Sequence, residues 1–182
     1  MRVDRVDYTN PDDQLALVNL LNAYAQDPLG GGAGLTPEVQ KRLPEALSRM
    51  PGACSFIVRR DGAPLGLLNA FTGFSTFNAR PLINIHDVFV VPEARGSGVL
   101  QMLFDAIEAE ARAQNCCKIT LEVLEENHRA QAAYRRQGFK GYDVGEVGGQ
   151  RRGAQGYVSG RAGSRGGGSP RRRGCGPVLR DR

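Results

Sequence analysis

The stretch at residues 88–99, VFVVPEARGSGV, decides the fold of this chain. Strand-forming residues precede Pro92, and Gly96 and Gly98 allow the backbone to come close to a ligand. After the glycines, apolar residues recur at the spacing of one helix face: Leu100, Leu103, Phe104 and Ile107. The stretch therefore predicts a buried strand, a glycine-rich turn and a helix. The unpaired N–H groups and the positive dipole end of that helix favour an anionic ligand such as a diphosphate.

A second motif begins at residue 119. Residues 119–123 read ITLEV, which indicates a strand, and a segment with helical spacing follows it. The fixed positions of this segment are Asn127, Ala130, Tyr134, Gly138 and Phe139. The two motifs, in this order and spacing, resemble the GNAT superfamily of acyl-CoA-dependent N-acetyltransferases, and the resemblance covers residues 1–145.

The glycine turn of that superfamily reads Arg or Gln, two residues, Gly, one residue, and then Gly or Ala. Arg95 and Gly98 match the first two fixed positions, whereas Leu100 stands where Gly or Ala is usual. The Leu100 side chain either crowds the diphosphate or points away from it. The resemblance implies acetyl-CoA as cosubstrate, bound largely through backbone groups and by Asn127 at its pantetheine arm. The implied cofactor-binding residues are Val88, Phe89, Val90, Arg95, Gly96, Ser97, Gly98, Val99, Leu100, Asn127 and Tyr134.

Apolar periodicity and turn residues predict a mixed α/β fold. The predicted order is a strand at 2–8, helices at 11–29 and 36–50, strands at 54–60, 64–74 and 83–91, a helix at 98–114, a strand at 118–123, a helix at 127–137 and a strand at 139–142. This order matches the GNAT-type fold, which implies a mixed central sheet with flanking helices. Its two central parallel strands, here 83–91 and 118–123, splay apart beside the glycine turn.

The chain divides by charge into two parts. Residues 1–150 hold 15 Lys and Arg against 18 Asp and Glu, a net of −3, whereas residues 151–182 hold nine Arg against Asp181, a net of +8. We therefore predict a GNAT domain at residues 1–147 and an Arg/Gly-rich, disordered tail at 148–182. Residues 156–159 are only a weak candidate for the last strand of the fold, so an out-of-frame tail is an alternative. A tail that contacts nucleic acid is a further one, which the lack of interleaved aromatics disfavours.

Composition limits the remaining choices. No apolar run reaches the roughly 18 residues of a membrane helix, and the N-terminal residues lack the apolar core of a signal peptide, so a cytoplasmic location without a membrane partner is the default expectation. The four cysteines show no metal-ligand spacing, so we expect reduced thiols and no metal. A missing last strand would leave a sheet edge open to pairing with a second copy of the chain.

Two residues are candidates for the base that deprotonates an amine. Glu122 sits among apolar neighbours in a central strand, where burial would raise the pKa of its carboxyl; alternatively it pairs with an Arg. His86 lies nine residues before Arg95, where other superfamily members place a base; alternatively it is a hydrogen-bonded core residue. Simple alternation places His86 on one sheet face with Asn84 and Val88, and Asp87 on the other face with Ile85 and Phe89.

Tyr134 is the candidate general acid. It lies seven residues after Asn127, two helical turns along the same face, and the resemblance implies that its hydroxyl points at the cofactor sulfur. The alternative is a core aromatic residue. The sequence thus predicts an N-acetyltransferase that moves an acetyl group from acetyl-CoA to a primary amine of a small molecule, a protein N-terminus or a lysine. The alternative is a catalytically impaired CoA-binding protein with a nucleic-acid-binding tail.

Overall fold

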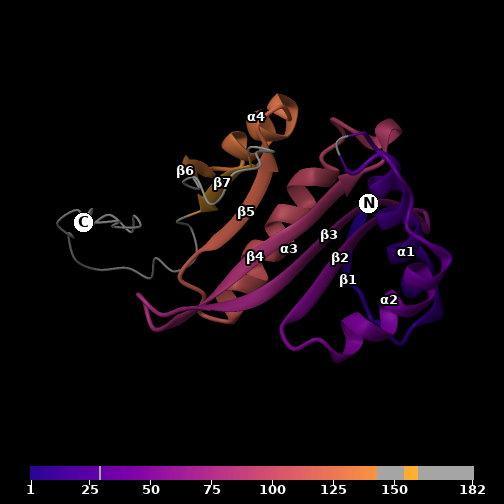
Figure 1. The fold of residues 1–182 in the computed structure, drawn as a ribbon, viewed down its shortest axis with the longest axis horizontal. Coiled ribbons are helices and arrows are strands. Elements are labelled where there is room, and N and C mark those ends of the chain that lie inside the picture. Colours follow the sequence, from indigo (N-terminus) through magenta and orange to yellow (C-terminus); the bar gives the residue numbers. More distant parts are fainter. Residues whose placement is uncertain (29, 143–153, 160–182) are drawn as a thin grey trace.

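The computed structural model describes residues 1–28, 30–142 and 154–159 of the chain (Figure 1). Its elements are β1 (Arg2–Arg5), α1 (Pro11–Gln26), α2 (Pro37–Arg49), β2 (Ala53–Arg60), β3 (Ala63–Ser75), β4 (Arg80–Val90), the short 3₁₀ turn η1 (Pro92–Ala94), α3 (Val99–Ala113), β5 (Ile119–Leu124), α4 (His128–Arg136), β6 (Lys140–Tyr142) and β7 (Ala154–Ser159). The mixed α/β fold and the predicted order of elements are confirmed.

Local side-chain chemistry explains several of the element boundaries. The Oδ1 atom of Asn10 accepts hydrogen bonds from the backbone N–H groups of Asp12 and Asp13, which caps the start of α1. Between β2 and β3, Asp61 and Gly62 both have positive φ values, 52° and 85°. This is the backbone of the tight turn that suits the twist of a two-stranded hairpin.

Seven strands form one sheet in the order β1-β2-β3-β4-β5-β7-β6. Strands β4 and β5 run parallel, and they pair only between residues 83–85 and 119–121. Beyond these three pairs the two strands separate, and β5 continues toward α4 (Figure 1). The predicted splay of the two central strands therefore begins at His86 and Glu122.

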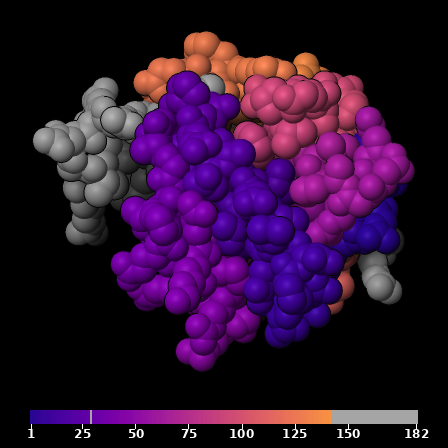
Figure 2. Space-filling view, turned by 90° about the vertical axis from the view of Figure 1, so that its right-hand side faces the viewer, coloured from indigo at the N-terminus to yellow at the C-terminus, as the bar shows by residue number. Residues whose placement is uncertain are grey.

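Helices cover both faces of the sheet. The side chains of one apolar cluster join α1 and α2 to one face, among them Leu17, Leu20, Leu47, Ile57, Leu67 and Phe89. A second cluster joins α3 to the opposite face, among them Val58, Leu68, Ile83, Ile85, Leu103 and Ile107. Residues of α4 pack on the edge of this second cluster. The indigo and purple atoms of the N-terminal residues cover much of the surface in Figure 2.

A β-bulge in β4 corrects the alternation expected around His86. Asn69 of β3 pairs with Asp87 and the next residue, Ala70, pairs with Ile85, so His86 is an extra residue without a partner across the strand pair. The bulge reverses which face the following residues take. As a result Ile85 packs on the α3 side and Phe89 on the α1 side, not on one face together.

The segment after residue 147 is partly described. Residues 154–159 form β7, which lies between β5 and β6 and pairs with both in antiparallel fashion. The weak strand candidate at 156–159 is thus part of a strand, and β7 occupies the edge of β5 that a missing strand would have left open. The predicted domain boundary stays a prediction, because residues 143–153 and 160–182 lie outside the described residues.

Within the described part of the chain, no helix combines the length and the apolar character needed to cross a membrane.

Candidate functional site

The glycine turn between β4 and α3 forms an open backbone cradle. Gly96 and Gly98 have φ values of 82° and 90°, which residues other than glycine rarely adopt. A Cβ atom placed on either glycine would meet no atom within 4 Å, so the space above the turn is open. Helix α3 starts directly after Gly98 and has no side-chain cap there. Its first N–H groups therefore face open space, an arrangement that fits an anionic phosphate group.

A cavity of about 520 Å³, which we call the turn cavity, adjoins this cradle. Nine of the predicted cofactor-binding residues line it: Val88, Phe89, Val90, Arg95, Gly96, Gly98, Leu100, Asn127 and Tyr134. Two predicted residues do not. The hydroxyl of Ser97 donates to the carbonyl of Ala94 at 2.6 Å, and Val99 is buried in the core with 1% of its surface exposed. The backbone N–H of Ser97 also donates to the carbonyl of Ala94, at 3.3 Å, so the backbone N–H of Val99 is the better candidate of the two for ligand binding.

The turn cavity is basic. Arg95, Arg129 and Arg136 line it, against the single carboxylate of Asp27. Arg95 donates from Nε to the carbonyl of Val90 at 3.1 Å, and its Nη2 lies 3.4 Å from Oδ2 of Asp27. Both side chains of this ion pair are about one third exposed, so it is a weak contact that a stronger anion can displace. The charge of the cavity therefore favours an anionic ligand.

A smaller cavity of about 250 Å³, the splay cavity, lies where β4 and β5 separate. It is lined by Tyr24, Ile85, His86, Val88, Leu121, Glu122, Val123, Leu124, Asn127, Ala130 and Tyr134. Glu122 is its one acidic residue, and neither Arg nor Lys is among these lining residues. The splay cavity shares five residues with the turn cavity, so the two form a continuous groove. Its charge suits an amine rather than an anion.

Tyr134 lies where the two cavities meet. Its ring packs against those of Phe104 and Phe139, with centroid distances of 5.8 and 6.4 Å. Burial raises the pKa of the Tyr134 phenol, and the nearby Tyr24 phenol adds to the effect. The hydroxyl is therefore protonated at neutral pH, as a general acid must be. Asn127 caps α4 by accepting from the N–H of Ala130 at 3.1 Å, so its amide nitrogen is the group left to face the groove.

The two candidate bases both line the splay cavity, and both are exposed. The burial expected for Glu122 is wrong, because the side chain points away from the α3-side core that holds Leu121 and Val123. The ring of His86 contacts that of Phe71 edge-on, at a centroid distance of 4.8 Å. His86 is therefore not a hydrogen-bonded core residue.

Sequence reasoning missed several residues of the groove. Tyr24 lines both cavities, although the sequence predicted only that it belongs to the helix at 11–29. Gln101, Arg129 and Arg136 line the turn cavity. A signal for the two arginines existed, because residues 129, 133 and 136 are spaced four and three apart and so share one face of the predicted helix. No local signal marked Tyr24, because its position depends on how α1 packs across the sheet.

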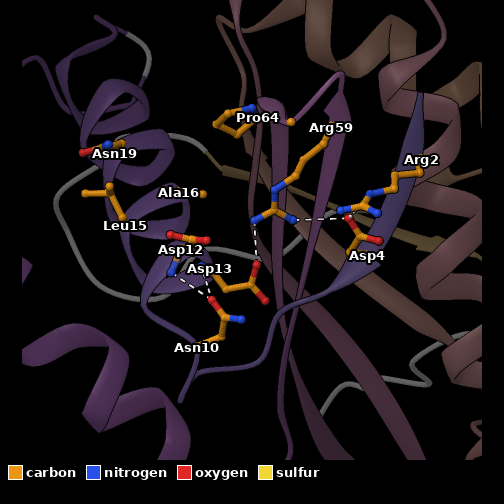
Figure 3. A pocket seen from close by; sticks show the side chains of 11 residues that line it. Arg2, Asp4, Asn10, Asp12, Asp13, Leu15, Ala16, Asn19, Arg59 and Pro64 are labelled. Carbon is orange, nitrogen blue, oxygen red and sulfur yellow. Dashed lines mark hydrogen bonds and ion pairs between the residues drawn. The ribbon is translucent and has the colours of Figure 1, made fainter.

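A third cavity, of about 620 Å³, lies elsewhere, between the start of α1 and the strands β1 and β2 (Figure 3). The guanidinium of Arg59 lies in it, 2.6 Å from Oδ1 of Asp13 and 3.3 Å from Oδ2 of Asp4. These ion pairs join α1 to two strands. Since the charges satisfy each other and the cavity lies at the opposite end of α1 from Tyr24, we interpret it as structural.

The described cysteines offer no nucleophile to the groove. Cys54, Cys116 and Cys117 are free thiols, and none lines either cavity. Burial raises the pKa of the Cys54 thiol to about 11 and also raises that of Cys116. Cys175 lies outside the described residues. Among the side chains that the structure describes, no group of His, Cys, Asp and Glu is arranged to hold a metal ion.

Comparison with known proteins identifies the family. Residues 17–139 match the model of the acetyltransferase (GNAT) family. Among solved structures, a probable acetyltransferase is 21% identical, with a TM-score of 0.70 over 83% of this chain and 97% of the other. The ribosomal-protein-alanine N-acetyltransferase from Brucella melitensis biovar Abortus 2308 is 16% identical, with a TM-score of 0.65 over 83% of this chain and 99% of the other.

An aminoglycoside acetyltransferase from an uncultured soil metagenomic sample is 14% identical, with a TM-score of 0.66 over 82% of this chain and 96% of the other. At these identities the structures show a shared fold. No curated protein matches the chain. The family match spans both the glycine turn and the Asn127–Tyr134 motif, and we conclude that this chain belongs to the GNAT acetyltransferase family.

Proposed function

We propose that this protein transfers an acetyl group from acetyl-CoA to a primary amine by direct attack of the amine on the thioester. The observation that carries the proposal is the meeting of two cavities of opposite charge at Tyr134. The basic turn cavity with its open glycine cradle suits the anionic end of the cosubstrate. The splay cavity, which holds a carboxylate and a histidine, suits the amine.

The described residues divide the chemistry between them. Backbone N–H groups at the start of α3 and the three arginines of the turn cavity hold the diphosphate, while Asn127 and the strand residues 88–90 hold the arm that leads to Tyr134. Acetyl-CoA, when bound, supplies an activated acyl group and a thiolate leaving group. The hydroxyl of Tyr134 gives its proton to that thiolate, and Glu122 or His86 takes the proton of the attacking amine, directly or through water.

The acceptor is a primary amine whose identity is still to be found. Because His86 and Glu122 are exposed, a bulky amine, such as an aminoglycoside or a peptide N-terminus, can present its nitrogen from solvent. The solved neighbours named for ribosomal-protein alanine and for aminoglycosides suggest these two classes as the first to screen. We also retain a cytoplasmic location as a prediction.

Two measurements on the full chain test this function. Saturating acetyl-CoA at about a hundred times its dissociation constant should stabilise the protein by about 2.7 kcal/mol, which raises the melting temperature by several degrees. Release of the CoA thiol, followed with a thiol reagent across a panel of amines, then identifies the acceptor. A stable protein that shows no shift would contradict the proposal.

Leu100 supports one alternative, a CoA-binding protein with impaired catalysis. Its side chain lines the turn cavity where the family has Gly or Ala. A clear shift in melting temperature without thiol release for any amine would favour this alternative.

A further inference from the structure

A chain of buried and partly buried polar side chains crosses the sheet beside the splay cavity. Ser55, Asn69 and Asp87 lie directly opposite one another on β2, β3 and β4. Ser55 and Asn69 are 1% and 3% exposed, on the face whose other side chains include Ile57, Leu67 and Phe89. Polar groups in such a layer cost free energy unless they are hydrogen-bonded, so their hydrogen bonds fix how these side chains are oriented.

The hydrogen-bond directions along this chain are determined. The hydroxyl of Ser55 donates to Oδ1 of Asn69 at 2.6 Å, and Nδ2 of Asn69 donates to Oδ2 of Asp87 at 3.0 Å. Because Ser55 has one hydrogen and uses it there, the Tyr8 hydroxyl, 2.8 Å from Ser55 Oγ, must be the donor of that bond. We call the row Tyr8–Ser55–Asn69–Asp87 the polar ladder. Every hydrogen bond along it is donated in the direction of the Asp87 carboxylate.

The polar ladder ends at the bulge that shapes the splay cavity. The strand register shifts between Asn69 and Ala70, and Asp87 is the first residue after the extra residue, His86. A strand without the bulge would turn Asp87 toward the α3-side core and Val88 away from it, because a one-residue slip exchanges the two faces. The bond from Asn69 to Asp87 opposes this slip, because Asp87 would lose its donor.

The Asp87 end of the polar ladder also lies near Tyr24. Asp87 lies on the α1 side of the sheet with Phe89, and the ring of Tyr24 packs against Phe89 at a centroid distance of 5.9 Å. Burial raises the pKa of the Tyr24 phenol, and the charge of Asp87 raises it further. The carboxylate therefore lies close to a residue that lines both cavities.

We propose that Asn69, supported by Ser55 and Tyr8, is a positioning residue for acetyl transfer, which holds Asp87 and thereby fixes the bulge at His86 and the shape of the splay cavity. This inference rests on the proposed function, since it concerns the placement of the amine beside the thioester. It predicts that the ladder affects the transfer step more than it affects binding of the cosubstrate, whose diphosphate cradle lies beyond the end of β4.

The test compares Asn69→Leu with Thr72→Val. Thr72 lies on the same strand and its hydroxyl donates to Oε1 of Gln114 at 2.8 Å. The control therefore removes one side-chain hydrogen bond away from the bulge, whereas Asn69→Leu removes two at the bulge. At a temperature where both variants are fully folded, we expect kcat of Asn69→Leu to fall at least tenfold while its Kd for acetyl-CoA stays within threefold. Thr72→Val should change neither quantity by more than threefold.

A second readout does not depend on enzymatic activity. The backbone amide resonances of His86 and Val88, measured by NMR without substrate, should move in Asn69→Leu and stay in place in Thr72→Val. Asp87→Asn keeps an oxygen acceptor for the Asn69 amide and should lose less activity than Asn69→Leu. If Asn69→Leu does not fold, Ser55→Ala takes its place, with the same expected direction in both readouts.

Two results would overturn the inference: unchanged resonances at the bulge, or a kcat within threefold of wild type in the folded variant. If the wild-type protein binds acetyl-CoA but acetylates no amine, the proposed function fails. The resonances then still decide whether the ladder holds the bulge.

Discussion

The role of the glycine cradle in binding acetyl-CoA can be tested with two glycines that have similar backbone conformations. One lies at the cradle and the other lies in a turn away from it. Gly98 has a φ of 90° and lines the turn cavity, while Gly62 has a φ of 85° and lies in the β2–β3 turn. A Cβ atom on either glycine would meet nothing within 4 Å. Gly98→Ala and Gly62→Ala therefore impose the same backbone strain without a clash.

The expected magnitudes follow from that geometry. Holding alanine in a left-handed conformation costs about 1–2 kcal/mol, which lowers the melting temperature by about 2–8 °C for a domain of this size. In Gly98→Ala the new methyl group also enters the space above the cradle and holds a diphosphate away from the α3 N–H groups. Losing one such charge-assisted hydrogen bond costs about 1.5–3 kcal/mol, so Kd for acetyl-CoA should rise at least tenfold.

Isothermal titration calorimetry and thermal unfolding measure the two effects separately. Both variants should lose similar stability, and only Gly98→Ala should lose affinity for acetyl-CoA. The reasoning is refuted if Gly98→Ala binds acetyl-CoA within twofold of wild type while its stability falls as expected, because the ligand would then not lie over this turn. An equal loss of affinity in Gly62→Ala would show that the effect is not local.

Four further predictions concern the groove. Tyr134→Phe should lower kcat by about 10²–10⁴ with Kd for acetyl-CoA little changed, as expected for loss of a general acid; an equal loss in both would contradict that role. Since burial raises the pKa of Tyr134 above its unfolded value, its neutral form stabilises the fold fully below about pH 10, and this contribution is lost at higher pH; unfolding measured above pH 10 should show a smaller loss in the Phe variant. Glu122→Gln and His86→Gln should differ in how kcat/KM depends on pH. The variant that lacks the base should lose the fall in kcat/KM on the acidic side, and the other variant should keep it; two unchanged profiles would indicate a water chain. Leu100 packs against the α3-side core as well as lining the cavity, so Leu100→Gly should lower stability by more than the roughly 1 kcal/mol helix cost of glycine without tightening acetyl-CoA binding, and a tighter Kd would show that Leu100 crowds the diphosphate.

Much of the fold could be read from local chemistry. Asn10 before Pro11 marks the start of α1, Asp61-Gly62 marks a hairpin, and Gly96 and Gly98 mark the turn before α3. Each of these signals acts within a few residues, so it works regardless of what the rest of the chain does. The same holds for the Asn127–Tyr134 spacing, which the structure places on one side of the groove.

Other features of the site depend on contacts between distant segments. Tyr24 reaches the groove because α1 packs on the face of β4 that carries Phe89. Arg59 is buried because Asp4 and Asp13 approach it from two other elements. The sequence contains these residues, but it carries no nearby signal for the partners that define their environment.

The strand at 83–91 shows where sequence reasoning ends. Its residues by themselves determined a buried strand that leads to a glycine turn, because apolar β-formers and glycines have local preferences. Only the tertiary structure decided which face each side chain takes, since the bulge at His86 results from pairing with Asn69 on β3. The exposure of Glu122 also depends on strand pairing, because β4 separates from β5 after residue 85. Alternation is a property of one strand, whereas register and splay are properties of strand pairs, and these pairs determine the shape of the groove.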